Sequence, residues 1–220
     1  GVEDFLENSS THIDIVKLGW GTSLVTPMLK EKIRIYHDHN IPVCLGGTLL
    51  EKFISSKKFE DYVSWVRDLG LTYVEISDGV INLPHDIKLS YIKKLSKEFT
   101  VLSEIGDKDE NIETPPYRWI EMALSELEAG AWKVIGEGRE SGTVGLFRDT
   151  GAIRSGLIEE VVTKIGPESW IFETPQKSQQ LWFIQRFGPN VNLGNIAPAE
   201  VIPLETLRLG LRADTLVSEE

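Results

Sequence analysis

The sequence contains little cysteine, little positive charge and no long apolar run. Cys44 is the single cysteine among 220 residues, which excludes an intrachain disulfide and a cysteine-based zinc site. Aspartate and glutamate number 34 against 23 lysines and arginines, so the formal net charge is −11. A protein that binds a nucleic-acid backbone needs a basic surface, and we therefore expect no nucleic-acid partner.

The apolar segments that direct a protein to a membrane are also lacking. The longest apolar runs fall far short of the ~20 residues that a membrane span needs. Residues 1–4 contain neither the basic nor the apolar part of a secretory leader. We therefore expect a cytoplasmic protein with no membrane partner, which agrees with the scarcity of cysteine.

The sequence does contain a repeat of short β-rich runs, each closed by glycine, proline or small polar residues. Strands are predicted at Ile13–Leu18, Pro42–Leu45, Thr72–Ile76, Thr100–Ile105, Ala131–Ile135, Ser169–Glu173 and Asn190–Leu193. The first five begin at residues 13, 42, 72, 100 and 131, which are 29, 30, 28 and 31 residues apart. This interval is the length of one strand–helix unit.

Segments with helical periodicity lie between these strands. Helices are predicted at Val2–Glu7, Lys30–His37, Phe59–Arg67, Leu89–Phe99 and Tyr117–Ala129. Strands alternating with helices predict an α/β fold with a parallel sheet, and the (β/α)8 TIM-type barrel is the commonest fold built from this unit. Because a barrel needs one strand more, we expect a single barrel domain over residues 1–220 whose first strand is absent from the chain. The alternative is a seven-stranded doubly wound sheet.

Acidic side chains stand at or just past four successive strand ends. They are Glu75, Glu104, Glu137 and Glu173. The strand ends of a parallel barrel meet at one rim, where converging carboxylates repel one another unless Mg²⁺ or a lysine neutralises them. This pattern favours a magnesium site. The alternative is a structural ring in which Glu75 and Glu104 pair with Lys17 or Arg139.

Glycines followed by hydroxyl side chains come after the first two strands. Glycine lets the backbone approach a ligand closely, and hydroxyl groups near a helix start can donate to an anion. Thr22 and Ser23 in one segment, and Gly47 and Thr48 in the other, are therefore candidate anion ligands. The alternative for the first segment is an ordinary turn in which Ser23 caps a helix.

Histidine and cysteine are poor candidates for the chemistry. The four histidines, which are His12, His37, His39 and His85, fall outside the strand ends, and this disfavours a histidine-driven mechanism. Cys44 lies inside a predicted strand, where we expect a buried and inert thiol.

The segments Lys17–Ser23, Gly46–Leu49, Val74–Gly79, Glu137–Gly142 and Pro175–Gln180 together resemble the phosphosulfolactate synthase family. The similarity continues through Val191–Ile196 and Leu204–Arg208, so it covers essentially the whole chain in order. Members of that family begin with a further strand that carries an Asp-Lys-Gly motif, in agreement with the strand that counting finds to be missing.

The resemblance implies a (β/α)8 barrel enzyme of the carbon–sulfur lyase class, expected to form a homo-oligomer. Such an enzyme uses Mg²⁺ to add sulfite to C3 of phosphoenolpyruvate, giving 2-phospho-3-sulfolactate by an enolate-type mechanism. The family serves coenzyme M biosynthesis in some archaea and sulfolactate formation in some bacteria. Phosphoenolpyruvate and sulfite are therefore the expected small-molecule partners.

The resemblance also implies roles for particular residues. The expected magnesium ligands are Glu75, Asp78, Glu104 and Glu137. Lys108 is the first candidate for the general acid, and Lys17 is the second. The expected donors to the substrate anions are Thr22, Ser23, Gly47, Thr48, Arg139, Ser141, Asn192, Gly194 and Asn195. Barrel phosphate sites often use the last strands, which favours Gly194 and Asn195.

Two other functions remain open at this point. One is a non-catalytic role like that of the plant heat-stress-associated relatives of the family. The other is a barrel enzyme that performs related enolate chemistry on a different phosphorylated acid.

Overall fold

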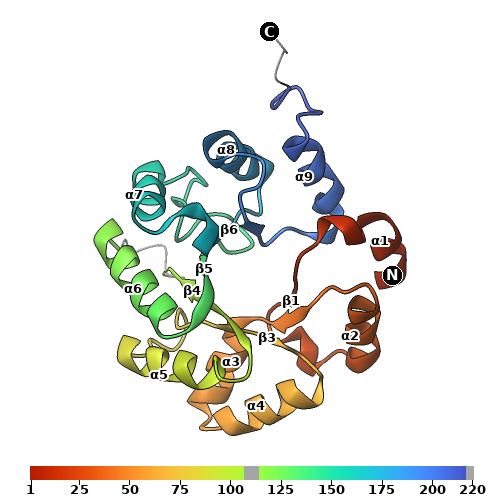
Figure 1. Cartoon of the computed structure of the whole chain (residues 1–220), viewed down its shortest axis with the longest axis vertical. Coiled ribbons are helices and arrows are strands. Elements are labelled where there is room, and N and C mark those ends of the chain that lie inside the picture. The colour runs from red at the N-terminus through yellow and green to blue at the C-terminus, as the bar shows by residue number, and fades with distance from the viewer. Residues whose placement is uncertain (107–113, 217–220) are drawn as a thin grey trace. The chain divides into compact units, whose positions relative to one another are not determined.

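The computed structural model describes residues 1–106 and 114–216 of the chain. The strands are β1 (Val16–Leu18), β2 (Val43–Leu45), β3 (Tyr73–Ile76), β4 (Thr100–Ile105), β5 (Ala131–Gly136), β6 (Trp170–Glu173) and β7 (Leu193–Gly194). The α-helices are α1 (Val2–Ser9), α2 (Leu29–Asp38), α3 (Gly47–Ser55), α4 (Phe59–Asp68), α5 (His85–Leu95), α6 (Pro116–Glu128), α7 (Ser155–Ile165), α8 (Lys177–Phe187) and α9 (Val201–Arg208). The 3₁₀ turns are η1 (Ser10–His12), η2 (Thr22–Leu24), η3 (Pro167–Ser169) and η4 (Pro198–Glu200). Figure 1 labels the α-helices and most of the strands and colours the chain from red at the N-terminus to blue at the C-terminus.

The strands pair in parallel, so the predicted α/β class is confirmed. β1 pairs with β2 in one sheet, and the order in the other is β3-β4-β5-β6-β7. In the second sheet Tyr73 stands opposite Thr100, and Phe172 stands opposite Leu193. Over the described residues β2 and β3 pack against each other without a shared backbone ladder, so the strands form two sheets instead of one closed ring.

The chain groups into two compact units. The first comprises Gly1–Ile105 with Met122–Val134, and the second comprises Gly106–Glu121 with Ile135–Glu220. In the first unit, aliphatic side chains of the short strands are covered by the apolar faces of helices such as α2 and α4, from which Ile33 and Tyr62 are fully buried. Burial of such side chains removes apolar surface from water, which is the main force that holds the helices on the strands.

The core of the second unit is aromatic. Trp170 and Phe172 on β6 stack with ring centroids 5.9 Å apart, and Phe172 packs on Phe183 of α8 at 4.5 Å. Trp119 lies 6.4 Å from Trp170, and all four side chains are completely buried. Large rings of this kind bury much apolar area per residue and dominate the energetics of a core.

The observed elements differ from the predicted ones at particular boundaries. β1 and β7 begin at Val16 and Leu193, three residues later than predicted, because the residues before them are not part of a ladder. No helix was predicted at Gly47–Ser55, where the structure has α3 with Gly46 as its N-cap, so Gly47 and Thr48 form the first turn of a helix. Within the described residues no helix is both long enough and apolar enough to cross a membrane.

Candidate active site

Lys17 and Glu75 form an ion pair at the carboxyl ends of β1 and β3. The Nζ atom of Lys17 lies 3.1 Å from Oε2 of Glu75 and 4.0 Å from Oε2 of Glu104, the next strand's acid. The other oxygen of Glu75 accepts a hydrogen bond of 2.7 Å from the backbone amide of Gly47. Glu75 is thus held by a lysine and by the N-terminus of α3, both of which favour its negative charge.

Close backbone approaches bring these elements together. A Cβ atom at Gly46 would lie 3.3 Å from Cα of Gly19, in the segment after β1. A Cβ atom at Gly47 would lie 2.5 Å from Oγ and 2.9 Å from N of Ser77, in the segment after β3. Glycine at position 47 therefore lets α3 begin against the end of β3, where its amide reaches Glu75.

Gly47→Ala is expected to destabilise the protein by about 1–3 kcal/mol, because the added methyl group overpacks the contact with Ser77. Gly19→Ala is the matched control, since a Cβ atom there meets nothing within 4 Å. Urea unfolding curves of both variants and of the parent protein provide the measurement. Equal free energies of unfolding for the two variants would contradict the close contact.

The segment that carries Asp78 is held by a buried acid of α3. Glu51 is 1 % exposed, and its Oε2 accepts hydrogen bonds from the amides of Val80 at 2.8 Å and Ile81 at 2.9 Å. The hydroxyl of Ser77 donates to the other oxygen of Glu51. A carboxylate with several donors is a satisfied buried charge, and here it fixes the path of the chain on both sides of Asp78.

A buried lysine of α5 contacts the same segment from another direction. The Nζ atom of Lys88 lies 3.2 Å from Oδ1 of Asp78, 2.9 Å from Oε1 of Glu126 and 2.6 Å from the carbonyl oxygen of Glu104. Burial disfavours the charged amine, but the nearby Glu126 and Asp78 outweigh burial and raise the pKa of Lys88. Lys88 therefore carries its positive charge inside the protein.

Sequence analysis missed Glu51, Lys88 and Glu126. The signal for two of them lies in helical spacing. Lys88 shares a face of α5 with the buried Ile92 and Leu95 at i+4 and i+7, and Glu126 likewise follows two buried residues of α6. A charged residue at a core position of an amphipathic helix indicates a buried ion pair.

In the second unit, two carboxylates share backbone donors. The amide of Arg139 donates to Oε1 of Glu137 at 2.8 Å and to Oε2 of Glu173 at 3.1 Å, and the amide of Gly138 donates to Oε2 of Glu173 at 3.1 Å. Arg139 has a φ of 61°. A left-handed backbone is unfavourable for arginine and is a frequent feature of functional sites.

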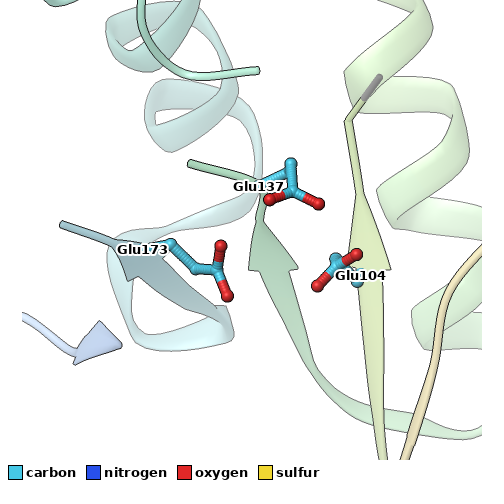
Figure 2. Close-up of side chains that lie close together, drawn as sticks. All are labelled: Glu104, Glu137 and Glu173. Carbon is cyan, nitrogen blue, oxygen red and sulfur yellow. The ribbon is translucent and has the colours of Figure 1, made fainter. Parts of the chain in front are cut away.

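Three buried carboxylates gather at successive strand ends of the five-stranded sheet. Figure 2 shows them on Glu104 of β4, Glu137 just past β5 and Glu173 of β6, and one oxygen from each lies within 4.8 Å of the others. Two of the predicted magnesium ligands, Glu104 and Glu137, belong to this group. Glu173 was noted as a strand-end acid but was not predicted as a ligand. Glu75 and Asp78 are not members of the group among the described residues.

The remaining predicted site residues lie in several environments. Thr22 donates its hydroxyl to the carbonyl of Gly19 at 2.8 Å, and Ser23 is buried. Thr48 is exposed in the first turn of α3. The hydroxyl of Ser141 forms a hydrogen bond of 2.7 Å with Thr143. Lys108, the predicted general acid, lies outside the described residues.

The predicted site residues around β7 lie before the strand, at its end and after it. Asn192 precedes β7, and its side-chain amide donates at 2.9 Å to the carbonyl of Trp170, the first residue of β6. Gly194 ends β7 and accepts a hydrogen bond of 3.0 Å from the amide of Thr174. Asn195 follows with a φ of 56°, so it shares a left-handed backbone with Arg139 and Trp20. All three of these left-handed residues follow a strand's carboxyl end.

The thiol of Cys44 is buried in β2 and 1 % exposed. Burial raises the pKa of this thiol far above its ordinary value. The predicted burial of Cys44 is confirmed. Because a thiol with a raised pKa does not form the nucleophilic thiolate at neutral pH, Cys44 is a poor candidate for a nucleophile.

Comparison with known proteins identifies the family. A sequence model of the (2R)-phospho-3-sulfolactate synthase (ComA) family matches residues 1–214. The chain belongs to the phosphosulfolactate synthase family. A phosphosulfolactate synthase of Bacillus subtilis is 44% identical over 216 residues, with 97% of this chain and 86% of the relative covered. A phosphosulfolactate synthase of Methanocaldococcus jannaschii is 44% identical over 222 residues, with coverages of 97% and 88%.

Two more distant similarities bear on the fold and on alternatives. This chain superposes on a crystal structure of 3-hexulose-6-phosphate synthase with a TM-score of 0.52 at 14% identity, covering 92% of this chain and 91% of that one. This likeness shows the fold alone, which is that of the TIM-type enzymes. Protein HEAT-STRESS-ASSOCIATED 32 of Arabidopsis thaliana is 25% identical over 94% of this chain and 79% of its own length.

Proposed function

We propose that this phosphosulfolactate synthase homologue adds sulfite to C3 of phosphoenolpyruvate and forms 2-phospho-3-sulfolactate, a reaction of the carbon–sulfur lyase class. The observation that carries the proposal is the family match over residues 1–214. The buried acids and Lys17 at the strand ends support it, because the reaction needs a cation to stabilise negative charge, which the acids would hold, and a group that donates a proton.

The reaction makes separate demands on the chain. The sulfur lone pair of sulfite forms a bond to C3, and the electron pair of the C2–C3 double bond moves to C2 and into the adjacent carboxylate. A proton is then transferred to C2, so that atoms and charge balance. Lys17 carries an ammonium at a strand end and is 28% exposed, which makes it a suitable donor among the described residues. Lys108 stays the other candidate for this step.

The buried carboxylates fit a magnesium ion. Mg²⁺ prefers oxygen ligands and is commonly bound by one or two carboxylates together with substrate oxygens. Glu104, Glu137 and Glu173 are each at most 5 % exposed, and three gathered carboxylates in such a place repel one another unless a cation is present. When bound there, Mg²⁺ supplies positive charge that stabilises negative charge on the substrate carboxylate.

The two anions of the substrates need donors of their own. Arg139 has an exposed side chain beside the Glu137 segment, and its guanidinium suits bidentate binding of a phosphate or sulfite group. Asn195, Gly194, Thr48 and Ser141 lie at or after strand ends and are proposed to assist. The predicted coenzyme M or sulfolactate pathway, cytoplasmic location and homo-oligomeric state belong to the same proposal.

A spectroscopic assay tests the function. The protein, phosphoenolpyruvate, sulfite and MgCl₂ are expected to give a sulfite-dependent loss of the ultraviolet absorbance of the enol ester, with 2-phospho-3-sulfolactate identified by mass spectrometry. No loss with any divalent metal would contradict the proposal and favour the non-catalytic alternative. Loss with another nucleophile but not with sulfite would favour related enolate chemistry.

A further inference from the structure

Lys88 uses all of its hydrogen-bonding capacity inside the protein. An ammonium group has three protons to donate. The acceptors around Nζ are Glu126 Oε1, Asp78 Oδ1 and the carbonyl oxygen of Glu104, at 2.9, 3.2 and 2.6 Å. The side chain is 1 % exposed, so these acceptors take the place of water.

The acceptors belong to three different elements. Glu126 lies on α6, Asp78 lies in the segment after β3, and the third acceptor is the main chain of β4 at the residue that contributes its carboxylate to the three-acid group. Lys88 itself lies on α5. The lysine therefore connects the outer helices with the ends of the two strands that carry candidate site acids.

Stability alone does not account for a charge at this position. Removing an ammonium from water is costly, and a buried ion pair is often no more stable than well-packed apolar residues of similar volume. Ile92 and Leu95 occupy the same face of α5 and meet the need for packing without that cost. A cation at position 88 adds fixed contacts to Asp78 and to the Glu104 carbonyl.

We infer that Lys88 is a positioning residue that holds the Asp78 segment and the end of β4, and thereby fixes the carboxylate of Glu104 for metal and substrate. This inference rests on the proposed function. Glu51 holds the Asp78 segment through Ser77, Val80 and Ile81, so the segment is fastened by one buried acid and one buried base. Lys88 touches neither substrate nor metal and acts through the groups that do.

The test separates the contact with the site segments from the contact with Glu126. Lys88→Met alone would leave Glu126 as a buried acid without its lysine partner and endanger folding, since Glu126 is 0 % exposed. The comparison is therefore made between Glu126→Gln and the double variant Lys88→Met/Glu126→Gln. The single variant keeps Lys88 bound to Asp78 and Glu104, whereas the double variant removes both buried charges together.

Magnesium binding is measured by calorimetry with MgCl₂ alone, and kcat and KM are measured with phosphoenolpyruvate and sulfite. Glu126→Gln is expected to stay within about 3-fold of the parent protein. The double variant is expected to lose about 10–100-fold in magnesium affinity and in kcat/KM, the usual effect of removing a group that orients a metal ligand. Lys88→Gln/Glu126→Gln, which restores an amide donor for the Glu104 carbonyl, is expected to recover part of the loss.

The outcomes are distinguishable. Inactivity of the parent protein would contradict the proposed function, while the magnesium affinities of the variants would still test the role of Lys88. Equal affinities and kinetics for the single and double variants would overturn the inference. Failure of both double variants to fold, beside a folded Glu126→Gln, would also overturn it, because Lys88 would then serve the core and not the site.

Discussion

Glu137→Gln is expected to lower the turnover of phosphoenolpyruvate and sulfite by more than about 100-fold. Glu137 is a proposed magnesium ligand, and removal of a group that only orients a metal ligand already costs about 10–100-fold. Glutamine keeps the shape of the side chain and an oxygen for the amide of Arg139. It lacks the negative charge that a hard cation needs. The loss therefore tests the charge of Glu137 and leaves its packing intact.

Thermal unfolding provides a second measurement for Glu137→Gln. A ligand that binds only the folded state stabilises it by RT ln(1 + [L]/Kd), or about 2.7 kcal/mol at 100 times Kd. MgCl₂ is expected to raise the Tm of the parent protein and to leave that of Glu137→Gln nearly unchanged. In the absence of metal the variant is expected to be the more stable, because one of three repelling carboxylates has become neutral.

Glu159→Gln is the control for this experiment. Glu159 is a half-exposed acid of α7 that pairs with Arg186 at 2.9 Å, and an exposed pair of this kind contributes little to stability. Its magnesium response and turnover are expected to match those of the parent protein. Wild-type turnover and a full magnesium response in Glu137→Gln would show that the three-acid group does not bind the ion.

Lys17→Met is expected to lower kcat by about 10²–10⁴-fold, the usual contribution of a positioned general acid. Lys17 lies beside Glu75 and Glu104 at the strand ends and carries a transferable proton. Lys17→Arg keeps the positive charge and the pairing with Glu75, but its guanidinium does not release a proton near neutral pH. We therefore expect Lys17→Arg to retain substrate binding, with KM close to the parent value, and to share the low kcat.

Steady-state kinetics over a range of pH separates the acid from the charge. If Lys17 is the proton donor, both variants lose the alkaline limb of the kcat profile, whereas loss of charge alone affects only Lys17→Met. Lys52→Met, which replaces an exposed lysine of α3, is the control and is expected to leave the rate unchanged. Full activity of both Lys17 variants, with inactivity of Lys108→Met, would transfer the role to Lys108.

Local pattern in the sequence predicted the strands of the repeating part and most of its helices, although the helix predicted at Leu89–Phe99 is observed at His85–Leu95. β4 was predicted with its observed limits, and α4 was predicted to within one residue. The spacing of glycine and of apolar residues reflects which face of one helix or strand is buried. An element can therefore be predicted from its own residues, without knowing which other elements pack against it. α3 was not predicted, because Gly46 and Gly47 are poor helix formers. The place of its first turn is decided by the close contacts with Gly19 and Ser77.

The residues of the candidate site likewise include some that the sequence predicted and some that it did not. Glu104, Glu137 and Glu173 could be found from the sequence, because parallel strands bring their carboxyl ends to one edge and each acid follows or ends a strand. Glu51 and Lys88 could not be assigned a role, since their partners lie 10 or more residues away in segments that only folding brings within hydrogen-bond distance.

The sequence by itself determined the α/β class, the family and the strand-end position of the acids, because these follow from periodicity and from motifs that are local in the chain. The tertiary structure alone decided which acids gather within 4.8 Å and which are already engaged, such as Glu75 by Lys17 and Gly47. The physical reason is that a charge is satisfied by whatever donor lies near it in space, and sequence distance does not determine that neighbour.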